Sequence, residues 1–240
     1  MKAQTRAEFD QYARDYFKEM SHPLRDMIDP QGHYFIELKS RILEKLVREQ
    51  MDGRQSLCLV DVGTGLGLFE KYLSPSFPNI VALDLSFEML RVAGSLNLMP
   101  GSRSGYIQGN AFHLPLRSHS ADLVFMSCVM HHLEKEEIAL TLAELARVCA
   151  PNGYLVFFEH NPLNPITQLV VRTTSLDRNA RLVRHTRLEG LAKKAGIHIL
   201  RREFFLYGTR GMDDLLQRCA PWLNQLPLGG QYALIGQKSR

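Results

Sequence analysis

The sequence predicts a doubly wound α/β fold, and three observations support this prediction. From about residue 57 onward, short apolar runs alternate with segments of helical periodicity, the pattern of parallel strands joined by crossover helices. A glycine-rich turn follows the first run, where such a sheet commonly meets a ligand. The chain has 240 residues, 45% of them hydrophobic, so it can bury a full core. We therefore expect one domain over residues 1–240.

Two helices are expected before the first strand. Residues 6–19 carry four aromatic side chains at helical spacing, and Pro23 and Pro30 interrupt any continuation of that helix. A second helix is expected over about residues 34–50, where apolar side chains follow one side. The first strand-like run then begins at residue 57.

Five strand-like runs lie between residues 57 and 160, separated by helical segments such as 86–97 and 135–150. The runs cover residues 57–62, 79–85, 105–109, 121–129 and 153–160. Two more runs, 197–208 and 231–239, flank a helical segment. We expect the last strand to return beside its predecessor in the antiparallel direction.

Charge and cysteine content narrow the class of protein. The formal net charge is only +4, so the molecule does not bind nucleic acid by overall charge alone. Residues 172–210 nevertheless hold ten Lys or Arg against three acids, which predicts a local basic surface. The four cysteines, Cys58, Cys128, Cys149 and Cys219, lack paired spacing, and no leader or membrane-length apolar run is present. We expect reduced thiols, no membrane span and a cytoplasmic location.

The first predicted strand is followed by three closely spaced glycines, Gly63, Gly65 and Gly67. Missing side chains let the backbone approach a ligand, while the following helix offers its positive N-terminus to an anion. A dinucleotide fingerprint requires glycine where Leu68 stands, and no Gly-Lys-Ser/Thr of a P-loop follows. The turn therefore predicts a small-molecule cofactor of another kind.

Asp84 ends the next predicted strand, twenty-one residues after Gly63. A carboxylate in this place can accept hydrogen bonds from both hydroxyls of a ribose. The alternative is an acidic cap on the helix that follows. The glycine turn and this acid together indicate a nucleoside cofactor.

At these motifs the sequence resembles the class I S-adenosylmethionine-dependent methyltransferases. Their first motif is similar to VDVGTGLG at residues 60–67, and their second ends in an acid, as VALDLS does at residues 81–86. The resemblance covers about residues 55–165. The flanking segments EFDQYARDY, FFEHNPLNPIT and LPLGGQYALIGQK resemble a bacterial subgroup, the methyltransferase type 11/12 proteins, which act, where known, on small molecules.

The resemblance implies a seven-stranded sheet, S-adenosylmethionine as cofactor and S-adenosylhomocysteine as product. It divides the chain into an N-terminal helical lid (1–52), a cofactor-binding core (53–160), and a substrate-pocket insert with the C-terminal strands (161–240). Asn110 stands where the family often has aspartate, and its amide oxygen can still accept from the adenine amine. The implied cofactor-binding residues are Asp61, Gly63, Thr64, Gly65, Gly67, Asp84, Leu85, Met89, Asn110, Ala111, Phe112 and Cys128.

Candidate catalytic residues lie at the ends of the fourth and fifth predicted strands. His131 and His132 follow one strand, and Glu159 and His160 end the next, so both pairs should face one cleft. Histidine is a suitable base near neutral pH, although hydrogen-bonded histidines with a structural role would produce the same pattern.

Candidate substrate contacts come from two other segments. The resemblance places Tyr12 or Tyr16 near the cofactor, with helix packing as the alternative. Asn161 and Asn164 would contact the acceptor, with a proline-stiffened loop as the alternative.

No metal is expected. Cys128, His131, His132 and His113 could be imagined around zinc, but C-x-x-H-H supplies no second ligand pair of the usual spacing.

We expect a methyltransferase that acts on a small molecule, with oxygen slightly favoured over nitrogen or sulfur because of the histidines. One alternative is an RNA methyltransferase that uses the basic residues 172–210, although no RNA-binding module or motif is evident. The other is a non-catalytic module that binds S-adenosylmethionine and acts through a partner.

Overall fold

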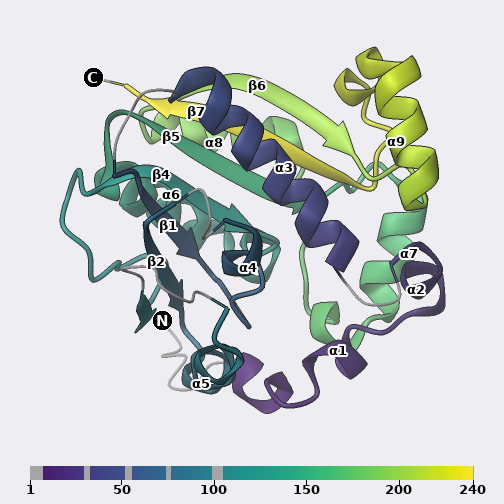
Figure 1. The fold of residues 1–240 in the computed structure, drawn as a ribbon, viewed down its shortest axis with the longest axis horizontal. Coiled ribbons are helices and arrows are strands. Elements are labelled where there is room, and N and C mark those ends of the chain that lie inside the picture. The colour runs from purple at the N-terminus through teal and green to yellow at the C-terminus, as the bar shows by residue number, and fades with distance from the viewer. Residues whose placement is uncertain (1–7, 30–32, 52–55, 74–76, 99–104, 240) are drawn as a thin grey trace.

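The computed structural model describes residues 8–29, 33–51, 56–73, 77–98 and 105–239. They form one seven-stranded sheet in the order β3-β2-β1-β4-β5-β7-β6 (Figure 1). Strands β1 to β5 are parallel to one another, and β7 runs antiparallel between β5 and β6, which confirms the predicted fold. The strands are β1 (Cys58–Val62), β2 (Asn79–Asp84), β3 (Gly105–Gln108), β4 (Ala121–Ser127), β5 (Cys149–His160), β6 (Ile197–Phe205) and β7 (Gln231–Lys238).

Helices cover both faces of the sheet, so the central strands are apolar on both sides. Helices α3 (His33–Gln50) and α4 (Glu70–Leu73) pack on one face, and α6 (Lys135–Val148) and α8 (His185–Lys194) on the other (Figure 1). Alternate residues of β5 show the division, since Leu155 and Phe157 join the core under α6, while Val156 and Phe158 join that under α3. Helix α5 (Phe87–Leu96) follows β2.

The N-terminal segment departs from the single helix expected over residues 6–19, of which 6 and 7 lie outside the described residues. It forms a 3-10 helix, η1 (Glu8–Tyr12), and then two short helices, α1 (Tyr16–Glu19) and α2 (Pro23–Ile28). Tertiary contacts explain the break. Asp10 accepts hydrogen bonds from Ser86 Oγ and the Glu88 N–H at the start of α5, while Phe9 packs edge-on against His132. Pro23 begins α2 instead of ending a helix, in keeping with the preference of proline for the first turn.

The expected insert contains α7 (Pro165–Thr173) and a 3-10 helix, η3 (Ser175–Asp177). Together with α1 and α2, α7 lies at the end of the sheet toward which the parallel strands point (Figure 1). Helix α9 (Arg210–Cys219) and η4 (Pro221–Gln225) connect β6 to β7. None of the described helices is long and apolar enough to cross a membrane.

The basic residues of the 172–210 stretch come from several elements of the fold. They are distributed over α7, the segment that contains η3, α8, β6 and the start of α9. Four of them pair with acids: Arg181 with Glu134, Arg201 with Glu49 and Glu203, Arg202 with Glu189, and Arg210 with Glu37. These acids partly neutralise the charge of the stretch.

Candidate active site

The turn after β1 requires glycine for two separate reasons. Gly63, Gly65 and Gly67 have φ angles of +82°, +56° and +68°, which L-residues rarely adopt. A Cβ atom on Gly63 would lie 2.4 Å from Val129 Cγ2, and one on Gly67 would lie 2.6 Å from the Tyr106 hydroxyl oxygen. At Gly65 no described atom lies within 4 Å of such a Cβ, because this residue faces a cavity.

The acid at the end of β2 meets this turn directly. Asp84 Oδ2 accepts a hydrogen bond of 2.8 Å from the Gly65 N–H, and Oδ1 accepts one of 2.8 Å from the Ser86 N–H. Burial raises the pKa of Asp84, while these backbone donors counteract the rise. The two features on which the cofactor prediction depends are therefore neighbours in space.

Asp61, on β1, is a second buried acid beside the turn. It is 1% exposed, and neither carboxylate oxygen has a hydrogen-bond partner among the described residues. Burial and the nearby Glu70 carboxylate raise the pKa of Asp61 well above its ordinary value. A buried, unpaired carboxylate is costly, and an ammonium group would compensate it. The amine of S-adenosylmethionine fits this requirement.

One cavity of about 300 Å³ begins at the glycine turn and ends at the histidines after β4 and β5. Ten of the twelve expected cofactor residues lie on its wall, all except Asp61 and Gly67. The expected catalytic residues fall into two groups. His132 and His160 line the cavity. His131 and Glu159 are each 1% exposed and lie behind its wall. Of the expected substrate contacts, only Tyr16 reaches the wall formed by the described residues.

Glu159 and His131 form a buried pair at the end of β4. The Oε2 atom of Glu159 lies 2.6 Å from His131 Nδ1, and Oε1 accepts hydrogen bonds from the N–H groups of Val129 and Met130. Burial disfavours the charged imidazole, but Glu159 and Asp177 outweigh it and raise the pKa of His131 well above its ordinary value. His131 therefore holds its proton firmly, so it positions its neighbours and is not a free base.

His132 has the properties of a base. It lines the cavity, and its Nε2 lies 3.4 Å from Asp177 Oδ1. Burial lowers the pKa of His132, although the Asp177 carboxylate opposes the change, so the ring is neutral at pH 7. A neutral ring beside a carboxylate can accept a proton and be stabilised once charged.

Lys39 and Cys128 form a polar contact that the sequence analysis did not identify. The ammonium of Lys39, a residue 5% exposed on α3, lies 2.9 Å from Ser127 Oγ and 3.3 Å from Cys128 Sγ. Burial favours the neutral thiol, but Lys39 and then His160 outweigh it and lower the pKa of Cys128 to about 6. A lysine within the apolar side of the predicted 34–50 helix was the available signal.

Asp177 and Arg25 also lie on the cavity wall and were not among the expected site residues. Asp177 is one of only three acids in the basic 172–210 stretch, which was the signal available for it. No feature of the sequence around Arg25 indicated that it would be a site residue. Its guanidinium lies 5.1 Å from the centre of the Phe35 ring.

Asn161, Asn164 and Tyr12 lie elsewhere. The Asn161 amide is buried and donates to the carbonyls of Pro227 and Gly229, while its oxygen accepts from the Leu163 N–H. Asn164 caps α7, and its amide donates to the Leu228 carbonyl. Tyr12 packs beside the small cluster formed by Ala13, Leu66 and Met89. The asparagines thus connect the insert to the segment before β7.

The sheet order with one antiparallel strand, the glycine turn after β1 and the acid after β2 define a class I S-adenosylmethionine-dependent methyltransferase. A family model described as a methyltransferase domain (Methyltransf_11) matches residues 60–157. Residues 60–157 therefore form a methyltransferase domain of the S-adenosylmethionine-dependent class, and S-adenosylmethionine is the methyl donor.

Individual relatives are similar to most of the chain. A malonyl-acyl-carrier protein O-methyltransferase from Pectobacterium atrosepticum is 27% identical over 196 residues, which cover 80% of this chain and 75% of that protein. A demethylmenaquinone methyltransferase from Thermobifida fusca is 28% identical, covering 69% and 70%. The crystal structure of a Thermotoga maritima S-adenosylmethionine-dependent methyltransferase superposes with a TM-score of 0.66 at 17% identity, covering 96% of this chain and 98% of that one. This last similarity concerns the fold.

We expect Asp84→Asn to weaken S-adenosylmethionine binding while the protein stays folded. The change keeps the shape of the side chain and one acceptor oxygen but removes the charge that would assist the ribose hydrogen bonds, so the Kd should rise about 10- to 100-fold. Isothermal titration calorimetry measures it, with Asp214→Asn, an acid on α9 outside the cavity wall, as control. An unchanged Kd would remove Asp84 from the cofactor site.

Cys128 should react as a thiolate at neutral pH. Its alkylation rate by iodoacetamide, followed by mass spectrometry of the Cys128 peptide, should rise with pH around a midpoint of about 6. Lys39→Met should move the midpoint upward. At a pH below the midpoint, each unit by which the pKa of Cys128 rises lowers its thiolate fraction about tenfold. Lys45 is an exposed lysine on the same helix, so Lys45→Met should leave the midpoint unchanged. A wild-type midpoint near the ordinary value of 9.0 would contradict the assignment.

Asn161→Ala should destabilise the fold more than Asn164→Ala. The first change deletes a buried amide with three hydrogen bonds, which costs about 2–4 kcal/mol of unfolding free energy, and the second removes a helix cap worth about 1 kcal/mol. Urea denaturation of both variants measures the two costs. Equal, small costs would show that the Asn161 contacts do not hold the insert in place.

Proposed function

We propose that this protein transfers a methyl group from S-adenosylmethionine to a small-molecule acceptor, with oxygen as the favoured accepting atom. The observation that carries the proposal is the single cavity that joins the cofactor turn to His132, His160 and Asp177. Its volume of about 300 Å³ lies at the lower end of the range for small-ligand sites. Its wall is mostly apolar and includes aromatic side chains from the N-terminal segment.

The residues at the far end of the cavity have properties that suit methyl transfer to a hydroxyl group. Bound S-adenosylmethionine supplies a methyl group on a positively charged sulfur. His132 accepts the acceptor proton, and Asp177 stabilises the imidazolium that results. The acceptor oxygen then forms its bond to the methyl carbon as the carbon–sulfur bond breaks, and the electron pair stays on sulfur. The apolar walls keep water out and hold donor and acceptor in line.

The acceptor pocket also contains two cationic side chains, Arg25 and Lys39. Among the described residues, no carboxylate lies in salt-bridge contact with either of them. An acceptor with an apolar body and an acidic group would suit this environment, because Arg25 would neutralise the acid away from water, while Lys39 pairs with the Cys128 thiolate. The relatives agree with a small or carrier-bound acceptor, since one is named for O-methylation of a malonyl group and another for a menaquinone precursor.

Two observations favour this proposal over an RNA substrate. The basic residues 172–210 come from several elements and four of them pair with acids, so fewer of them are left to bind phosphates. The acceptor end of the cavity is walled by η1, α1 and η3. A non-catalytic module would not need a base beside the cofactor, whereas His132 and Asp177 form one here.

A turnover assay tests the proposal. Release of S-adenosylhomocysteine is measured with a panel of hydroxylated aromatic and carboxylic acids, and in parallel with transfer and ribosomal RNA. We expect turnover with members of the small-molecule panel, and a fall in kcat of about 100-fold or more in His132→Gln with an unchanged cofactor Kd. His198→Gln, an exposed histidine on β6, serves as control. Turnover with RNA alone, or binding without any turnover, would contradict the proposal.

A further inference from the structure

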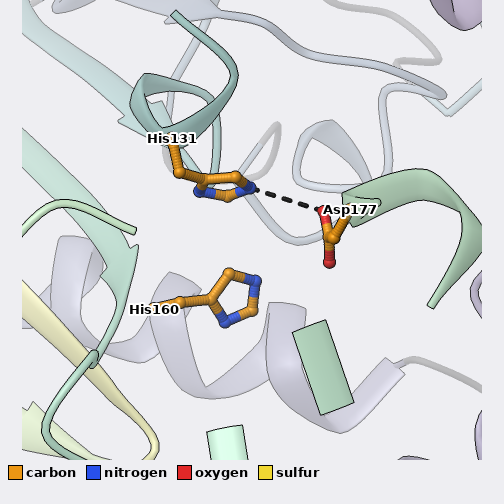
Figure 2. A group of neighbouring side chains, drawn as sticks. All are labelled: His131, His160 and Asp177. Carbon is orange, nitrogen blue, oxygen red and sulfur yellow. Dashed lines mark ion pairs between the residues drawn. The ribbon is translucent and has the colours of Figure 1, made fainter. Parts of the chain in front are cut away.

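Three side chains from separate segments meet at the acceptor end of the cavity. His131 follows β4, His160 ends β5 and Asp177 belongs to η3. Each offers one ligand atom, and these atoms lie within 4.8 Å of one another. Figure 2 shows the two rings one above the other, and their planes are tilted by 51° with the ring centroids 5.1 Å apart. Asp177 lies beside both, and one ring nitrogen of each histidine points toward it.

The distances within this group are unusual for hydrogen bonds. Asp177 Oδ1 lies 3.5 Å from His131 Nε2 and 3.4 Å from His132 Nε2. Both exceed the range of about 2.7–3.2 Å for N–H···O hydrogen bonds. The distance to His131 is close to the edge of about 3.4 Å in a tetrahedron whose centre lies about 2.1 Å from each ligand atom, and the ligand atoms of His131, His160 and Asp177 all lie within 4.8 Å of one another. The spacing thus leaves room for an ion between the imidazole and the carboxylate.

His131 is oriented as a metal ligand would be. Its Nδ1 lies 2.6 Å from the Glu159 carboxylate and keeps its proton, while Nε2 faces Asp177 and would release its proton to bind an ion. Metal-binding histidines almost always donate their other ring N–H to such a group. Glu159 is held in turn by two backbone N–H groups, those of Val129 and Met130.

His160 has a similar partner in Gln231, on β7. Its Nδ1 lies 3.4 Å from Gln231 Nε2, while Gln231 Oε1 is buried and has no hydrogen-bond partner among the described residues. The two ends of an amide are interchangeable by rotation about one bond. Rotation gives Gln231 Oε1 the His160 Nδ1 proton to accept, loses a 3.8 Å contact with Cys128 Sγ, and leaves His160 Nε2 for a ligand. The Gln231 amide nitrogen then takes the buried position in which the oxygen has no described partner.

We propose that His131, His160 and Asp177 bind one divalent transition-metal ion of the zinc type. Imidazole nitrogens with one carboxylate suit zinc, whereas magnesium and calcium prefer sites built from oxygen. The Asp177 and Glu159 carboxylates together balance the charge of a dication. Three protein ligands leave one position open, as in catalytic zinc sites, and His160 and Asp177 face the cavity.

The role of the ion depends on the function proposed above. The open position takes the hydroxyl oxygen of the acceptor and lowers its pKa, as bound zinc does for water. The proton passes to His132, and the oxygen then attacks the methyl carbon as the carbon–sulfur bond breaks. The sequence led us to expect no metal, because the ligands come from three segments without the paired spacing of a zinc motif.

Metal binding is tested on the full chain without an affinity tag and without an acceptor. The protein is stripped with a chelator, dialysed against Zn²⁺, and its zinc content is measured by mass spectrometry. We expect one Zn²⁺ per chain. Asp177→Asn and His160→Gln should each raise the Kd more than about 100-fold, because loss of an outer partner alone costs about 10- to 100-fold. His198→Gln, on β6, should bind as wild type does.

A second measurement keeps the test valid where a variant is unstable. Wild-type protein loaded with Co²⁺ should show the intense visible absorption of a four- or five-coordinate ion, and Zn²⁺ should displace it. No zinc uptake at micromolar concentration, or equal uptake by wild type, Asp177→Asn and His160→Gln, would overturn the proposal and identify the group as a proton-holding network. Because no acceptor is present, these results are independent of the turnover assay.

Discussion

The buried carboxylate of Glu159 is the interaction on which the arrangement of the acceptor site depends. It is 1% exposed, and a charge in such a place is costly unless it is paired and fully hydrogen-bonded. The N–H groups of Val129 and Met130 and the ring of His131 meet this need. The chain can supply them only by turning sharply after β4, where Cys128 adopts a φ of +56°. That turn directs His132 toward the cavity.

The two ends of the cavity differ in their charged groups. At the glycine turn, Asp61 and Asp84 are both buried acids, and burial raises the pKa of each. The other end holds both signs of charge, because Lys39 and Arg25 lie there together with Asp177. There Lys39 outweighs the effect of burial and lowers the pKa of Cys128. The second end therefore offers a polar group a partner of either charge.

The sequence predicted those features that depend on residues close together in the chain. The sheet, its antiparallel strand and the meeting of Gly65 with Asp84 follow from periodicity and from the common edge formed by the ends of parallel strands. It did not predict what depends on distant partners. A continuous N-terminal helix was wrong because Asp10 is drawn to the start of α5. Lys39 and Asp177 were missed because nothing near them in the chain indicates which side chains they face.

The N-terminal segment connects both ends of the cavity, and this explains why it cannot be one helix. Asp10 caps the start of α5 beside the cofactor residues Leu85 and Met89, while Phe9, the residue before it, packs at 5.0 Å on the ring of His132. These two contacts hold residues 8–12 in η1, and a turn at residues 13–15 separates them from α1. The N-terminal segment therefore contacts both His132 and the start of α5 through these two neighbouring residues.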